Sequence, residues 1–206
     1  MHHEIFIDEV YKFPGKSDAP SIIDAGANIG LSVIYFKRLY PKARIVAFEP
    51  DPELFSIMKS NVNAFGYGDV ILHEKALWSE EMELPFCREG SWAGHLSHDS
   101  SNKETILVPT VRLRDLLNEP VDMLKVDIEG AEMAVLSDCA DLLKNVANLF
   151  VEYHSFRDRP QELHALLGTL AAAGLRYNVQ GASTRQPFLP QEEELDNLAS
   201  IWAYRR

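Results

Sequence analysis

The fold is decided by the stretch Ile22-Ile23-Asp24-Ala25-Gly26-Ala27-Asn28-Ile29-Gly30 near the start of the chain. Its apolar beginning predicts a buried strand, and its glycines predict a tight turn into a helix. Gly26 lets the backbone approach a ligand closely, and Gly30 lets the helix lie close to the sheet. About twenty residues later, Val46-Ala47-Phe48-Glu49-Pro50 predicts a second strand that ends in an exposed carboxylate. This unit suits a ligand with a ribose, whose two hydroxyls can both donate to Glu49.

The spacing of the turn distinguishes a methyl-donor site from a dinucleotide site. A dinucleotide site usually has G-x-G-x-x-G, whereas this chain has Asp-x-Gly-x-x-x-Gly, with Asp24 two residues before the first glycine. That carboxylate would repel a pyrophosphate and attract the sulfonium and ammonium groups of S-adenosylmethionine. The turn therefore favours S-adenosylmethionine as cofactor, with an ordinary βαβ turn as the alternative.

Composition and charge limit the class of partner. The 206 residues suffice for a full core, and 46% hydrophobic and 25% charged residues are typical of a soluble globular protein. The net charge of −11 argues against a nucleic-acid partner. No apolar run is long enough to span a bilayer and no signal-peptide pattern is present, so we expect a cytoplasmic protein without a membrane partner. Cys87 and Cys139 lack metal-ligand spacing and are expected to be packed thiols.

Strand-like and helical runs alternate from residue 21 onward, as in a parallel sheet covered by helices on both faces. We expect a single α/β domain over 1–206, with a short N-terminal segment over 1–20. The expected fold is the class I methyltransferase type, a Rossmann-like, seven-stranded, mostly parallel sheet with its last strand antiparallel. The strands are expected near 21–25, 43–49, 69–76, 121–127, 148–154, 175–180 and 199–205, and the helices near 28–40, 52–66, 130–144 and 160–173.

The segment 82–109 interrupts this alternation. Two short strands, near 83–86 and 105–108, enclose a polar loop that carries Trp92, His95 and His98. Long loops inside compact domains are usually functional or disordered. We expect 82–109, and 87–104 in particular, to form a lid over the acceptor; a disordered surface loop is the alternative.

The fourth strand is expected to end in Lys125-Val126-Asp127-Ile128-Glu129-Gly130-Ala131-Glu132. Asp127 would face the amino acid end of the cofactor or the acceptor, whereas Glu132 fits a capping role in the first turn of a helix, and Glu129 fits either role. The run lacks the Asn/Asp-Pro-Pro-aromatic pattern of amino-directed nucleic-acid methyltransferases. Cys87 follows Phe86 and therefore lacks the Pro-Cys pair of cytosine-C5 enzymes. Carboxylates beside a histidine instead suit the removal of a hydroxyl proton.

The fifth strand is expected to end in Phe150-Val151-Glu152-Tyr153-His154, where Glu152 and His154 share a face by alternation. We predict that His154 is the general base, assisted by Asp127 or Glu152, because an unperturbed imidazole titrates near pH 6.5. Asp127 is the rival base. These residues and Glu129 could also hold a hard divalent ion, but no compact ligand motif singles them out, so no metal is expected.

Together these stretches resemble the FkbM family of methyltransferases. The resemblance rests on 24–30, 48–50, 125–132 and 151–154, and covers about residues 20 to 155. The segment 110–117 resembles the family's segment before the fourth strand, with Arg114 where aspartate is more usual. The resemblance implies a class I fold, S-adenosylmethionine as donor, and methylation of a hydroxyl on a sugar, polyketide or other secondary metabolite.

The leading hypothesis is therefore an S-adenosylmethionine-dependent O-methyltransferase that acts on a small hydroxylated acceptor. A non-catalytic module that binds S-adenosylmethionine and a nucleotide-cofactor oxidoreductase are the alternatives, and the sequence indicates no oligomeric state. Ala76 and Leu77 would flank the adenine, as in related enzymes. Asp24 and the amides around Gly26 and Asn28 would hold the methionine end, with Ser32 as an extra hydrogen-bond donor to its carboxylate. The expected cofactor residues are Asp24, Ala25, Gly26, Ala27, Asn28, Gly30, Ser32, Glu49, Pro50, Ala76, Leu77 and Asp127.

Overall fold

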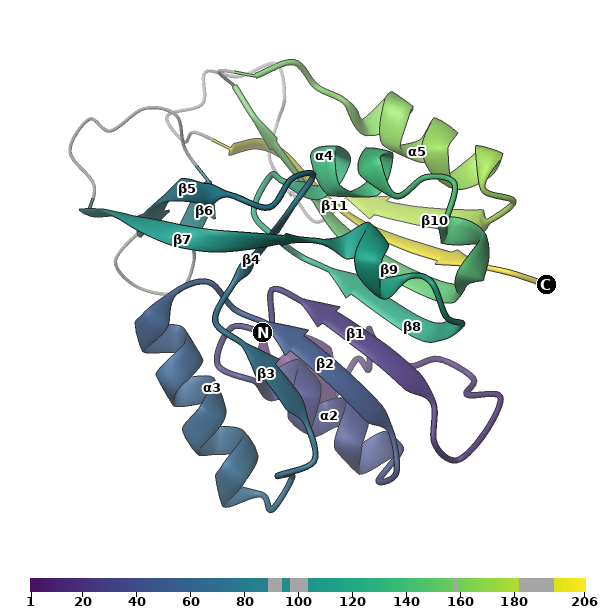
Figure 1. Ribbon diagram of the computed structural model, residues 1–206. Coiled ribbons are helices and arrows are strands. Elements are labelled where there is room, and N and C mark those ends of the chain that lie inside the picture. The colour runs from purple at the N-terminus through teal and green to yellow at the C-terminus, as the bar shows by residue number, and fades with distance from the viewer. Residues whose placement is uncertain (89–93, 97–103, 158, 182–194) are drawn as a thin grey trace.

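The computed structural model describes residues 1–88, 94–96, 104–157, 159–181 and 195–206 and has a seven-stranded sheet at its centre (Figure 1). The strand order is β10-β11-β9-β8-β1-β2-β3. All pairs from β9 to β3 are parallel, and β11 is antiparallel to both of its neighbours, which confirms the expected fold class. The strands are β1 (Ser21–Ala25), β2 (Arg44–Phe48), β3 (Ile71–His73), β8 (Val121–Val126), β9 (Val146–Phe156), β10 (Arg176–Gly181) and β11 (Leu195–Tyr204).

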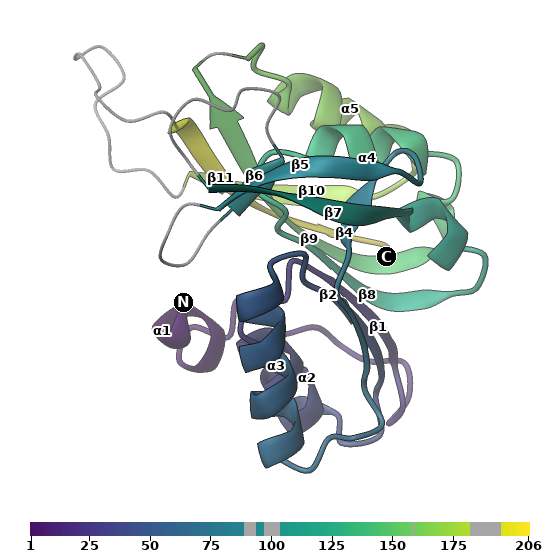
Figure 2. The same ribbon diagram turned by 60° about the vertical axis from the view of Figure 1, so that its left-hand side comes forward.

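Helices cover both faces of this sheet (Figures 1 and 2). On one face, α2 and α3 bury Phe36 and Met58 against apolar side chains of β1 and β2. On the other face, α4 and α5 bury Leu136 and Leu166 against β8 and β9. Because both faces are covered, the central strands can be almost continuously apolar. The helices are α2 (Leu31–Leu39), α3 (Pro52–Ala64), α4 (Glu132–Asp138) and α5 (Leu163–Ala172).

Local sequence signals place the starts and ends of these helices. Asp51 caps α3 by accepting hydrogen bonds from the backbone amides of Glu53 and Leu54, and Pro52 occupies the first helical position. The helix expected over 130–144 is shorter in the structure. It ends at Asp138 and is followed by a 3-10 turn, η2 (Leu143–Asn145).

A second sheet, which was not predicted, lies beside the first (Figure 2). The strand expected over 69–76 splits into β3 and β4, and β4 pairs in parallel with β7 instead of extending the main sheet. The two expected short strands are longer than predicted and pair with each other as β5 and β7. The second sheet consists of β4 (Ala76–Trp78), β5 (Glu83–Arg88), β6 (Gly94–Leu96) and β7 (Glu104–Arg112). Much of the expected lid, 89–93 and 97–103, lies outside the described residues. Trp92 and His98 belong to these ranges, so the lid stays a prediction.

The N-terminal segment over 1–20 packs against the main domain. It begins with a short helix, α1 (His2–Phe6), and its side chains Ile5, Tyr11 and Phe13 are buried against the α2 face. Cys87 and Cys139 are both buried, as expected. Among the described residues, no helix has the length and apolar character that a membrane crossing requires.

Candidate active site

A cavity of about 230 Å³ opens where β1, β2 and β8 end, beside β9. In an open α/β sheet, this edge is the usual place for a ligand. Predicted site residues that are far apart in the sequence line this one cavity. Those that line the cavity are Gly26, Asn28, Glu49, Pro50, Ala76, Leu77, Asp127 and Glu152.

Glu49 is held by two backbone amides at the end of β2. The amide of Asn28 donates to its Oε2 and the amide of Asp51 donates to its Oε1, both at 2.9 Å. The carboxylate is buried rather than exposed, which corrects the prediction from the sequence. Burial raises the pKa of Glu49 to about 7, although the two amide hydrogen bonds oppose this shift. The side chain is thus fixed in direction and can accept further hydrogen bonds from the cavity.

Gly26 occupies a position where no side chain fits. Its φ is 82°, and a Cβ built on it would lie 1.7 Å from the carbonyl oxygen of Asp127. The turn therefore passes directly against the end of β8, which brings the 24–30 turn and Asp127 to one site. Gly30 serves a different purpose from the predicted one. A Cβ there would lie 3.0 Å from Cγ of Met58, so the absence of a side chain lets α3, rather than the sheet, pack closely against Gly30.

Behind the turn lies a buried group of charges. Asp24 is fully buried and accepts a hydrogen bond of 2.5 Å from Oγ of Ser32. Nζ of Lys125 lies 3.4 Å from Asp24 Oδ1 and 3.3 Å from Asp127 Oδ2, and it donates to the Gly26 carbonyl at 2.7 Å. Burial lowers the pKa of Lys125, but Asp127 and Asp24 together raise it well above its ordinary value. Asp24, Ser32 and Lys125 are thus placed to support the turn from behind.

Lys125 is a site residue whose role was not predicted from the sequence. It stands opposite Asp24 in the register of β1 and β8. A signal for it exists, because a lysine inside an otherwise apolar strand is rarely buried without partners. The predicted residues Ala25, Ala27, Gly30 and His154 also lie outside the lining of the cavity.

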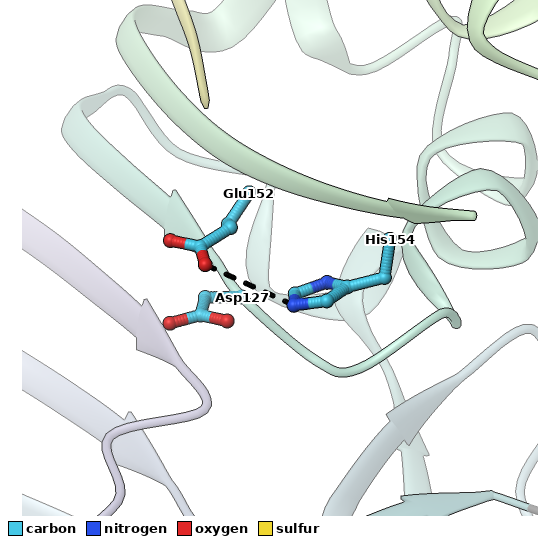
Figure 3. A group of neighbouring side chains, drawn as sticks. All are labelled: Asp127, Glu152 and His154. Atoms are coloured by element: carbon cyan, nitrogen blue, oxygen red, sulfur yellow. Dashed lines mark ion pairs between the residues drawn. The ribbon is translucent and has the colours of Figure 1, made fainter. Parts of the chain in front are cut away.

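Asp127, Glu152 and His154 come together at the ends of β8 and β9 (Figure 3). One side-chain oxygen or nitrogen from each lies within 4.8 Å of the others. The two carboxylates line the cavity, and His154 Nε2 lies 3.8 Å from Glu152 Oε1. Burial and the neighbouring Asp127 charge raise the pKa of Glu152 to about 7. Glu152 can therefore exchange a proton near neutral pH.

His154 is surrounded by carboxylates. Its Nδ1 lies 3.0 Å from Glu132 Oε1, and its Nε2 lies 3.2 Å from Glu129 Oε2. Burial lowers the pKa of His154, but Glu132 and Glu129 outweigh this effect and raise it to about 10. The ring is thus a cation at neutral pH. The prediction that His154 is the general base assumed an imidazole with an ordinary pKa. The two glutamates raise that pKa, so the ring holds its proton at neutral pH.

Comparisons with known proteins assign the chain to a family. Residues 24–177 match the methyltransferase FkbM domain. The chain belongs to the FkbM methyltransferase family. Methyltransferase 1 of Beauveria bassiana is 35% identical to it, over 71% of this chain and 70% of that protein. Methyltransferase sdnD of Sordaria araneosa is 33% identical, over 66% of each chain.

A solved FkbM structure shares the fold. The methyltransferase FkbM of Methylobacillus flagellatus superposes with a TM-score of 0.64 at 15% identity. The match covers 98% of this chain and 48% of that one, so this chain spans about half the length of the solved protein. The likeness bears on the fold of the FkbM domain and leaves the acceptor open.

The cluster in Figure 3 also has a donor set that could hold a divalent cation in this FkbM chain. However, both ring nitrogens of His154 already face glutamates, and Asp127 already faces the ammonium of Lys125. These existing partners favour the expectation that no metal is required.

Proposed function

We propose that this FkbM-family methyltransferase transfers a methyl group from S-adenosylmethionine to a hydroxyl of a small molecule, such as a sugar or a polyketide. The observation that carries the proposal is the placement of two sites in one cavity. The Gly26 turn and Glu49 form a place for a nucleoside, and the carboxylates of Asp127 and Glu152 line the same space. A methyl donor bound at the first site would therefore lie near the carboxylates that can accept the hydroxyl proton.

The residues present fit S-adenosylmethionine. Glu49, fixed by two amides, would accept hydrogen bonds from the ribose hydroxyls. Gly26 and Asn28 would lie against the methionine part, and Ala76 and Leu77 would flank the adenine with small apolar surfaces. When bound, this cofactor supplies a methyl group on a positively charged sulfur.

Glu152 is our choice for the group that removes the acceptor's proton. It lines the cavity, and its raised pKa makes the carboxylate a stronger base than an ordinary glutamate. The hydroxyl oxygen would take the methyl group as the methyl–sulfur bond breaks, with S-adenosylhomocysteine as the leaving group, and Glu152 would accept the hydroxyl proton. His154 then acts as a positioning residue, because the cationic ring has no lone pair to offer. Asp127 is held toward the cavity by Lys125 and is the rival base.

The names of further relatives support an oxygen acceptor. They include the hexuronic acid methyltransferase AglP of Haloferax volcanii, 28% identical over 70% of this chain, and the 2-O-methyltransferase NoeI of Sinorhizobium fredii, 25% identical over 65% of it. Membership in a methyltransferase family also disfavours the oxidoreductase alternative. The predicted repulsion of a pyrophosphate by Asp24 does not exclude an oxidoreductase, because Asp24 is buried and hydrogen-bonded to Ser32 behind the turn.

Transfer of a labelled methyl group tests the proposal. The protein is incubated with methyl-labelled S-adenosylmethionine and a metabolite extract, and mass spectrometry identifies labelled products. We expect a labelled methyl ether, and far less of it with Glu152→Gln. Donor binding by calorimetry without any labelled product would instead support the non-catalytic module. Label on nitrogen or carbon would overturn the hydroxyl acceptor.

A further inference from the structure

Tyr11 belongs to the N-terminal segment, outside the matched range 24–177, yet it lines the cavity of the candidate active site. Only 7% of the residue is exposed. Within the described part of the chain, its hydroxyl has no hydrogen-bond partner. A buried tyrosine hydroxyl usually finds such a partner, so this one indicates that a bound ligand supplies it.

The position of the Tyr11 ring is fixed by contacts with β9 and β11. The ring packs edge-on against Phe150 of β9, with the ring centroids 4.9 Å apart and an interplanar angle of 77°. The carbonyl oxygen of the preceding residue, Val10, accepts a hydrogen bond of 2.7 Å from Nε1 of Trp202 in β11. Because the ring is held before a ligand binds, little conformational entropy is lost when its hydroxyl forms a hydrogen bond.

Tyr11 lies beside the turn that would receive the methionine part of the donor. The centroid of its ring is 5.7 Å from Nζ of Lys125, and the same ammonium group donates to the Gly26 carbonyl at 2.7 Å. Burial raises the pKa of the Tyr11 phenol, although Lys125 opposes this shift. The hydroxyl therefore keeps its proton at neutral pH and can donate a hydrogen bond.

The groups expected to bind the methionine carboxylate are engaged within the chain. The backbone amide of each residue over 26–30 donates to an oxygen atom of the chain. The hydroxyl of Ser32 donates to Asp24 at 2.5 Å. A carboxylate has sites for several hydrogen bonds, so the methionine carboxylate needs donors from elsewhere in the lining. Tyr11 offers one.

We infer that the Tyr11 hydroxyl donates a hydrogen bond to the carboxylate of the methionine part of S-adenosylmethionine. This inference rests on the proposed function and adds a residue of the N-terminal segment to the donor site. A hydrogen bond to a charged acceptor is stronger than one between neutral groups. Tyr11 is then a binding residue for the donor, and Glu152 keeps its role in proton removal.

Calorimetry with two ligands of the donor site tests the inference. S-Adenosylhomocysteine carries the carboxylate, whereas S-adenosyl-3-thiopropylamine is the same molecule without it. Tyr11→Phe removes the hydroxyl and keeps the ring that packs against Phe150. This variant should bind S-adenosylhomocysteine about 10- to 100-fold more weakly than the unchanged protein. Its affinity for S-adenosyl-3-thiopropylamine should stay unchanged.

Tyr35→Phe is the matched control. Tyr35 is buried in the same apolar cluster as Tyr11, but it lies outside the lining of the cavity, and its hydroxyl donates to Glu9 at 3.4 Å. Both affinities should stay unchanged in this variant. An unchanged affinity of Tyr11→Phe for S-adenosylhomocysteine, or an equal loss for both ligands, would overturn the inference. If the unchanged protein binds neither ligand, the proposed function itself fails.

Discussion

The Nδ1 atom of His154 lies 3.0 Å from Oε1 of Glu132, and both side chains are buried. The same Glu132 oxygen accepts the backbone amides of Gly130, at 3.0 Å, and Ile128, at 3.3 Å. One carboxylate thus joins the loop after β8, the start of α4 and the end of β9. Glu132 lies in the first turn of α4, as expected, but α4 has no side-chain cap, and the carboxylate instead holds the loop before the helix. It also forms the ion pair that keeps His154 cationic.

This ion pair predicts how stability depends on pH. Because the folded pKa of His154 is raised to about 10, its contribution is complete below the unfolded value near 6.5 and is lost as pH rises through about 10. His154→Ala should destabilise the fold by about 3–5 kcal/mol near pH 7, since it leaves Glu132 buried without its cation. Urea unfolding at pH 6 to 10 measures this. An equal loss of stability at pH 6 and pH 10 would contradict the ion pair.

Glu152→Gln should lower turnover about 10²–10⁴-fold, because the amide cannot take the hydroxyl proton. Its affinity for S-adenosylhomocysteine should remain close to that of the unchanged protein. In the unchanged protein, turnover should rise with pH through about 7, as Glu152 becomes ionised, and the variant should lose this rise. Near-normal turnover in Glu152→Gln, with Asp127→Asn inactive, would transfer the role of base to Asp127.

Glu49 should make donor-site affinity depend on pH. The ionised carboxylate accepts ribose hydroxyls better than the protonated form, so affinity for S-adenosylhomocysteine should rise as pH increases through about 7. Glu49→Ala should weaken binding by about 1–3 kcal/mol, and Glu49→Gln should remove the pH dependence. Calorimetry between pH 5.5 and 8.5 checks both. An affinity that Glu49→Ala leaves intact would refute the ribose assignment.

The sequence predicted the central sheet well because its signals are local. The first strand, 21–25, coincides with β1, and Pro52 marks the start of α3. The second sheet was missed because β4 pairs with β7, so Ala76 lies opposite Thr110, a contact that no local pattern encodes.

The same limit applies to the site. The identities of its carboxylates and histidine follow from the motifs at the strand ends. Their protonation does not, because it depends on burial and on partners from other segments. Glu129 and Glu132, which set the charge of His154, lie on the loop and helix after β8, whereas His154 lies on β9.

Removal of divalent metal should leave turnover unchanged. His154 and Asp127 are engaged by Glu129, Glu132 and Lys125, so proton removal by Glu152 needs no further cation. The measurement is turnover after treatment with EDTA and desalting, with and without added Mg²⁺. Loss of activity that Mg²⁺ restores would mean that Asp127, Glu152 and His154 form a metal site.

Gly26→Ala should abolish donor binding, and Gly66→Ala is its matched control. The two glycines have similar φ values, 82° and 77°. Alanine in this left-handed conformation should therefore destabilise the fold by about 1–2 kcal/mol at either position. They differ in space: nothing lies within 4 Å of a Cβ at Gly66, whereas a Cβ at Gly26 would lie 1.7 Å from the Asp127 carbonyl oxygen. Backbone on both sides must then move, which separates the turn from Asp127. Calorimetry with S-adenosylhomocysteine should show binding in Gly66→Ala and none in Gly26→Ala, and equal affinities would show that the close approach at Gly26 is not required.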